Sequence, residues 1–331
     1  MRNRGSLGRA ALGMAISVVA LFLVARSVDI PAAWSVMREA QPQWLALLVG
    51  FVAIDLAVRA LRWKVLLSPV GRVRYADSAG SLLVGYLANN VLPARLGEFV
   101  RSHDLGERSG LSKSTILGTI VVERVMDTFV VVVIAAFAIF VLSVRGIVAS
   151  AVLVGLAITS LLVVAIVIGL VAHRLPGADR ASAFINQWPR VHGLLVRLRA
   201  GLAVTGNLRV MAISLGLTLV SWSCAVLGFA AAAQSVGIEP TMGQAALLAA
   251  GVNLATAVPA APGYVGTFEL AAVTIAASVG IDRESALAFA VLVHAVTLLI
   301  TSIGGAGALL VGGRRRARNV VPSVAEPGSQ P

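Results

Sequence analysis

The sequence predicts an all-α polytopic membrane protein with about six transmembrane helices and two re-entrant helical hairpins. Three observations predict this fold class. Of the 331 residues 58% are hydrophobic and only 13% are charged, and the mean hydropathy is +0.91. Soluble domains carry about 25% charged residues. The apolar segments are also interrupted twice by clusters of Asn, Pro and Gly, which predict the hairpins.

A single transmembrane domain is expected over residues 10–313, after a basic cytoplasmic arm at residues 1–9. Residues 10–25 form the first span, which we interpret as uncleaved because no small-residue cleavage site follows it. A short loop leads to the second span at residues 44–60, which ends at the basic residues Arg59, Arg62 and Lys64. Asp55 lies four residues before Arg59, so these two side chains can pair along one helix face.

The first predicted hairpin has arms at residues 75–88 and 93–101. An Asn before a Pro suits the start of a new helix, because Asn caps the first turn and Pro fits within it. Arg95 and Glu98 then share a helix face, and so do Glu98 and Arg101. We expect this arm to begin inside the membrane; a surface loop before an amphipathic helix is the alternative. The candidate residues here are Asn90, Pro93, Arg95, Gly97, Glu98 and Arg101.

Residues 114–142 form a long span that contains Glu123, Arg124 and Asp127. Ionisable residues inside a membrane are functional candidates, although a salt bridge that only holds the bundle together would also explain them. Residues 147–172 form a further span. The polar segment from Arg174 to Arg209 follows, within residues 173–209, and it predicts a basic amphipathic helix on the anionic cytoplasmic leaflet.

A span at residues 210–233 precedes the second predicted hairpin, whose arms are residues 241–258 and 267–279. Its break contains Pro262, Gly263, Gly266 and Glu269. Glu269 can pair with an arginine of the first hairpin, or it can cap the first turn of the second arm. The last span covers residues 284–311 and contains His294, which we interpret as a hydrogen-bonded packing residue. Residues 314–331 predict a disordered cytoplasmic tail.

The distribution of basic residues predicts the orientation. Of the 27 Lys and Arg residues, 21 fall on the side of both termini, four fall on the opposite side, and Arg95 and Arg124 lie within the membrane. This bias predicts a multi-pass protein of the cytoplasmic membrane with both termini in the cytoplasm. The net charge of +12 then reflects topology and contact with anionic lipid, not nucleic acid. The two hairpins would enter from opposite sides, as in a transporter built on an inverted repeat.

No catalytic, cofactor or metal motif stands out in the sequence, and the single Cys224 excludes a cysteine-based metal site. Arg95 and Arg124 are the best candidates to hold an anionic headgroup, because a guanidinium matches phosphate with two hydrogen bonds. Two other classes stay open. One is an enzyme with a lipid-linked substrate, in which Glu98, Glu123 and Asp127 hold a metal or act as base. The other is a scaffold that docks a partner through the Arg174 to Arg209 segment.

Four ordered motifs together resemble the lysylphosphatidylglycerol synthase transmembrane-region family. They are Arg59-Ala-Leu-Arg62-Trp63, Asn90-Val-Leu-Pro93-Ala-Arg95-Leu-Gly97-Glu98-Phe-Val-Arg101, Glu123-Arg124-Val-Met-Asp127 and Ala261-Pro262-Gly263-Tyr-Val-Gly266-Thr-Phe-Glu269. The family is the flippase-like half of the multiple peptide resistance factor and also occurs as stand-alone proteins. The resemblance covers nearly the whole chain.

The resemblance implies that the protein moves a polar-headed lipid, an anionic or modified phospholipid or a glycolipid, along a route lined by the charged and Gly/Pro residues of these motifs. In two-part relatives aminoacyl transfer belongs to a soluble domain that follows the membrane part. The chain stops at Pro331, so we expect no such enzymatic activity. Expected partners are the lipid substrate and either a second copy of the chain or a separate lipid-modifying enzyme. The alternative function is a membrane enzyme or accessory protein of lipid-linked glycan assembly.

Overall fold

The computed structural model describes residues 4–92, 96–146, 149–150, 154, 157, 161, 202–256 and 261–319. Within these ranges the chain is helical and has no strands. The α-helices are α1 (Arg4–Ser27), α2 (Ile30–Arg38), α3 (Pro42–Leu67), α4 (Tyr75–Val91), α5 (Gly97–Ser109), α6 (Lys113–Leu142), α10 (Leu208–Ser235), α11 (Met242–Ala255), α12 (Thr267–Ser278) and α13 (Arg283–Asn319). Two short 3-10 helices are η3 (Ala203–Gly206) and η4 (Pro262–Tyr264).

The prediction of an all-α polytopic membrane protein is confirmed. Among the described residues four helices, α3, α6, α10 and α13, are long and apolar enough to cross a membrane. The α1 helix forms a fifth candidate together with α2, from which it is bent by 86°. Large apolar side chains on these helices stay exposed, Phe140 by 82% and Ile303 by 69%, as suits contact with lipid. Most of the span predicted over residues 147–172 and most of the segment from Arg174 to Arg209 lie outside the described residues.

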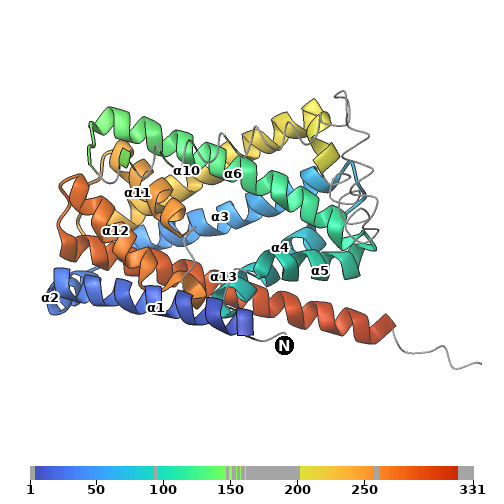
Figure 1. The fold of residues 1–331 in the computed structure, drawn as a ribbon, viewed down its shortest axis with the longest axis horizontal. Coiled ribbons are helices and arrows are strands. Elements are labelled where there is room, and N and C mark those ends of the chain that lie inside the picture. The colour runs from blue at the N-terminus through green and yellow to red at the C-terminus, as the bar shows by residue number, and fades with distance from the viewer. Residues whose placement is uncertain are drawn as a thin grey trace, which may run out of the picture.

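The two hairpins lie at opposite ends of the bundle and point toward each other (Figure 1). One consists of α4 and α5, which pack together, and the other consists of α11 and α12, which also pack together. Their tips meet in the middle of the molecule, where α4 packs against η4. A Cβ atom built on Gly263 in η4 would lie 3.7 Å from the carbonyl oxygen of Asn90 in α4. This opposed arrangement is the one expected for an inverted repeat.

Several helix boundaries differ from those expected. The loop expected at residues 26–43 contains α2, because Asp29 caps its first turn and a Pro occupies the start. The α3 helix continues beyond residue 60 to Leu67, because Trp63, Leu66 and Leu67 are fully buried in the bundle. The second arm of the first hairpin, expected to end at residue 101, continues as α5 to Ser109, where Gly110 ends the helix at φ +71°. The α1 and α13 helices likewise extend into the expected arm and tail.

Close backbone contact holds the first hairpin together. The Gly97 amide donates a hydrogen bond to Asn89 Oδ1 at 2.8 Å, which links the start of α5 to the end of α4. A Cβ atom at residue 97 would lie only 2.1 Å from the carbonyl oxygen of Gly85. Glycine is therefore required at this position by the approach of the two arms.

Candidate functional site

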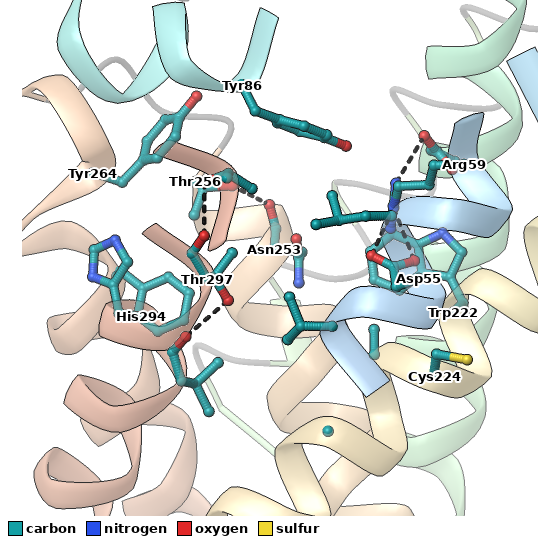
Figure 2. Close-up of a pocket in the computed structure, with 18 of the residues that line it drawn as sticks. Asp55, Arg59, Tyr86, Trp222, Cys224, Asn253, Thr256, Tyr264, His294 and Thr297 are labelled. Atoms are coloured by element: carbon teal, nitrogen blue, oxygen red, sulfur yellow. Dashed lines mark hydrogen bonds and ion pairs between the residues drawn. The ribbon is translucent and has the colours of Figure 1, made fainter. Parts of the chain in front are cut away.

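A cavity of about 360 Å³ lies where the two hairpin tips meet. Its wall is built by α3, α4, α6, α10, α11 and α13, together with residues from the start of α5 and from the second hairpin (Figure 2). Figure 2 shows Asp55, Arg59 and Trp222 on one side and His294, Thr297 and Tyr264 on the other. One wall thus carries an ion pair beside a tryptophan, and the facing wall carries a histidine, a threonine and a tyrosine.

The charged wall begins with an ion pair within α3. Arg59 Nε lies 2.9 Å from both carboxylate oxygens of Asp55, so the pair expected from their spacing is present. The Ser221 hydroxyl also donates a hydrogen bond to Asp55. Arg59 Nη1 lies 3.5 Å from Asp127 Oδ2, and its guanidinium lies 5.6 Å from the ring centroid of Trp222. Arg59 is therefore held from three directions at the cavity edge.

A second layer of charges lies behind this wall and is closed to solvent. Arg62, which is fully buried, donates from Nη1 and Nη2 to the two oxygens of Asp127 at 2.5 and 3.0 Å. Its Nη2 also lies 3.4 Å from Glu123 Oε1. Arg101 donates to that same oxygen at 3.3 Å and lies 4.6 Å from the Trp63 ring. Because Arg62, Arg101 and Glu123 do not line the cavity, we interpret these three as structural.

Arg124 is the most accessible charge of this cluster. Its side chain is 43% exposed and lines the cavity, whereas the side chain of Arg59 is 11% exposed. Arg124 Nη2 lies 3.3 Å from Glu123, but its contacts with Glu98 and Asp127 are longer, at 3.9 and 4.0 Å. A guanidinium with long contacts and an exposed edge can exchange partners at less cost than a buried one. Arg124 is thus the described arginine best placed to meet a ligand.

The cluster is electrically balanced within the described residues. Four arginines face four carboxylates from α3, α5 and α6, which are Arg59, Arg62, Arg101 and Arg124 with Asp55, Glu98, Glu123 and Asp127. The three carboxylates that could have held a metal, Glu98, Glu123 and Asp127, each lie within 4.0 Å of an arginine. The described residues contain no group of three His, Cys, Asp or Glu side chains arranged to hold a metal ion.

The break of the second hairpin has an unusual backbone. Gly263, Tyr264 and Gly266 have φ angles of +69°, +60° and +88°, of which only the glycine values are free of strain. Glu269 accepts the Gly266 amide at 2.7 Å and so caps α12, which is one of the two roles expected for it. Its second oxygen lies 2.6 Å from His294 Nδ1.

The predicted site residues within the described ranges divide into three groups. Arg59, Asn90, Glu98, Arg124 and Asp127 line the cavity. A second group lies behind the cavity and consists of Arg62, Gly97, Arg101 and Glu123. A third group builds the second break and consists of Pro262, Gly263, Gly266 and Glu269. Tyr264, in the same break, lines the cavity. Pro93 and Arg95 lie outside the described residues. The role of every one of these residues in binding stays a prediction.

Sequence reasoning missed the neutral part of the wall, which includes Tyr86, Asn253, Tyr264, Thr297 and Trp222. All but Tyr264 are isolated polar or aromatic residues in apolar helices and give no periodic signal, and Tyr264 lies in the second break, where only its neighbours were singled out. Trp222 is 4% exposed, and its indole Nε1 has no hydrogen-bond partner within the described part of the chain. An unpaired buried donor at a cavity wall is available to a ligand oxygen.

Comparison with known proteins gives two kinds of match. The family described as lysylphosphatidylglycerol synthase TM region matches residues 10–305. "Glycosyltransferase AglD" of Haloferax volcanii is 27% identical over 334 residues, which cover 90% of this chain and 53% of that protein. A "UPF0104 membrane protein" of Methanothermobacter thermautotrophicus is 30% identical over 132 residues, which cover 39% of this chain and 38% of that protein. The chain thus matches about half or less of each curated relative. No solved structure matches it significantly.

Proposed function

Because the chain belongs to the family of the lysylphosphatidylglycerol synthase transmembrane region, we propose that it moves a polar-headed lipid between the leaflets of its membrane. The family and the relative named as a glycosyltransferase associate it with lipid or glycan processes in a membrane. The observation that carries the finer proposal is the cavity of about 360 Å³ between two opposed hairpin tips, which has charged and polar groups on a largely apolar wall. Such a position is typical of substrate sites in transporters with broken helices.

The exposed side of the charge cluster supports a lipid rather than a soluble ligand. Arg124 shares a face of α6 with Val121, which is 41% exposed, and Phe99 of the adjacent α5 is 59% exposed. An arginine with an exposed apolar side chain beside it on its helix suits a substrate whose headgroup enters the cavity while its acyl chains stay in the bilayer. In this proposal a phosphate competes with Glu98 for Arg124, and the starts of α5 and α12 contribute positive helix-dipole ends.

Flux measurements in liposomes test the proposal. The protein is reconstituted with labelled anionic, aminoacylated and glycosylated lipids, and the rate of each between leaflets is compared with that in empty liposomes. We expect at least one lipid to move at least tenfold faster with protein, and Arg124→Gln to abolish the gain. Lys113→Gln is the matched control, because Lys113 pairs with Glu107 away from the cavity and is 46% exposed. No acceleration for any lipid would refute the proposal.

A second candidate is sugar transfer from a lipid-linked donor, which the name of the Haloferax relative favours. The match covers only about half of that protein, so its activity can belong to the other half. Incubation of the purified chain with polyprenyl-phosphate sugars and divalent metal distinguishes the two candidates. Glycosylated product formed without lipid movement would support the transferase.

For the orientation, we propose that the end of the bundle bearing the α3–α4 and α5–α6 turns faces the cytoplasm. That end carries Arg72, Arg74, Arg108, Lys113 and Arg209, besides the basic residues at the start of α1 and the end of α13. The opposite end carries fewer basic residues at its turns, which are Arg26, Arg38, Arg145 and Arg283. The positive-inside rule supports this orientation and the cytoplasmic membrane as the location.

A further inference from the structure

His294 joins two parts of the second hairpin. It lies on α13 and is 6% exposed. Its Nδ1 lies 2.6 Å from Glu269 Oε1, and its Nε2 lies 2.6 Å from the carbonyl oxygen of Gly263. The ring stacks on Phe268, with 4.4 Å between centroids. The ring is therefore fixed in orientation, and both of its nitrogens are engaged at hydrogen-bond distance.

These two contacts require a proton that an ordinary neutral histidine and an ionised glutamate lack. A carbonyl oxygen can only accept, so Nε2 must carry the hydrogen that binds Gly263. A neutral imidazole then has only a lone pair at Nδ1, and an ionised carboxylate also offers only lone pairs. A separation of 2.6 Å between Nδ1 and Oε1 is a hydrogen bond only if one proton lies between them. The pair holds that proton as imidazolium with carboxylate, or as imidazole with carboxylic acid.

The proton holds the break of the second hairpin in its observed form. Glu269 uses its other oxygen to accept the Gly266 amide, and His294 binds the Gly263 carbonyl, so the pair connects both sides of the break. A further hydrogen bond runs from the Ala261 amide to Ser17 on α1, and it does not involve a titratable group. We propose that Glu269 and His294 form a proton-binding site that holds this break in its observed conformation, and we call this pair the latch.

Other titratable groups line the same cavity. They are Tyr86 from α4, Tyr264 from η4, Cys224 from α10, Glu98 from α5, Arg124 and Asp127 from α6, and the Asp55–Arg59 pair from α3. Residues 242–255 of α11 contain no titratable side chain. Asp55 is already bound to Arg59 and Ser221, so it is not available to take the proton. On the α2 side, the Asp29 amide binds Glu284 at the far end of α13.

Loss of the proton would leave two acceptors, His294 Nδ1 and Glu269 Oε1, 2.6 Å apart. Their repulsion separates the two side chains and releases the latch. The released proton passes to the cavity, which His294 lines. If the proposed lipid movement holds, displacement of the second hairpin is then linked to a proton. The latch itself does not depend on that function, because it can be measured without any lipid substrate.

The first experiment locates the proton in the full chain at pH 7. Nitrogen-15 spectra of histidine-labelled protein, with the His294 signals assigned from His294→Gln, report the protonation of Nδ1. Infrared spectra report a carboxylic acid band that disappears in Glu269→Gln. We expect one of these two signals in the wild-type protein. An unprotonated Nδ1 together with an ionised Glu269 would overturn the proposal.

Glu269→Gln is a matched variant that should fold. Its amide nitrogen can donate to Nδ1 of a neutral His294 while its carbonyl oxygen accepts the Gly266 amide, so both contacts remain without the proton. The second experiment compares hydrogen exchange of residues 261–269 in the two proteins at a series of pH values. We expect exchange in the wild type to become at least tenfold faster than in Glu269→Gln at high pH. Equal rates at every pH would show that the proton does not hold the break.

Discussion

Arg62 and Asp127 form a two-point ion pair between α3 and α6, although they lie 65 residues apart in the chain. Both side chains are buried, by contrast with Arg124, whose side chain is 43% exposed one turn before Asp127. Breaking a buried ion pair costs about 3–5 kcal/mol, because the remaining charge has no partner. The cluster therefore contains arginines with two roles, one that holds the helices together and one that can reach a ligand.

The first prediction separates these two roles. Arg62→Ala should lower stability by about 3–5 kcal/mol and reduce the yield of folded protein, because Asp127 loses its two closest hydrogen bonds. Arg124→Gln should change stability by less than about 1 kcal/mol, because its contacts are longer and partly exposed. Thermal unfolding in detergent measures both variants. Equal losses would show that Arg124 is also structural.

The second prediction concerns the first hairpin. Gly97→Ala should prevent its arms from packing, because the new Cβ atom would lie 2.1 Å from the Gly85 carbonyl oxygen and 2.5 Å from Asn89 Oδ1. The control is Gly307→Ala on α13, where nothing lies within 4 Å and an alanine favours the helix. Size-exclusion profiles and thermal unfolding should show a loss for the first variant only. A stable Gly97→Ala protein would contradict this close packing.

The third prediction tests the cavity. In a Cys224→Ser background, Asn253→Cys and Thr297→Cys should react with a small water-soluble thiol reagent, because both positions line the cavity. Ala250→Cys, one turn before Asn253 on α11, should remain unreacted because that residue is fully buried. Mass spectrometry of the intact protein measures the modification. Protection of both cavity positions would show that water does not reach this space.

The fourth prediction tests the orientation. In the same background, Arg72→Cys and Glu239→Cys place one thiol at each end of the bundle. A reagent that cannot cross the membrane should label the second variant in intact cells and the first only after lysis. The reverse pattern would invert the proposed topology.

Local pairings could be predicted from the sequence, whereas pairings between helices could not. The Asp55–Arg59 pair follows from a spacing of four residues within one helix, and it is present. Glu98 and Arg101 were also expected on one face. Side chains three residues apart point in somewhat different directions around a helix axis. Glu98 therefore faces the cavity and Arg124, whereas Arg101 faces Glu123 in the interior of the bundle. The packing of α5 on α6 decides between these directions.

The opposed hairpins were predictable because clusters of Asn, Pro and Gly interrupt apolar segments of the chain. The contacts of His294 were not, because its partners Glu269 and Gly263 lie 25 and 31 residues earlier. A single histidine in an apolar helix indicates only a hydrogen-bonded packing residue, and its two partners become visible only once α12 and η4 lie against α13. The polar groups contributed by Asn253 and Thr297 were missed for the same reason.

The distance along the chain between Arg62 and its partners also affects how the protein is made. When α3 leaves the ribosome, Arg59 already has Asp55, but Glu123 and Asp127 have not yet been synthesised. Arg62 lies within the last six residues of α3, where a long arginine side chain can reach the membrane surface. It can therefore stay in contact with water until α6 is made and supplies Glu123 and Asp127. The ion pair thus forms late in biosynthesis, when α6 packs against an α3 that is already in the membrane.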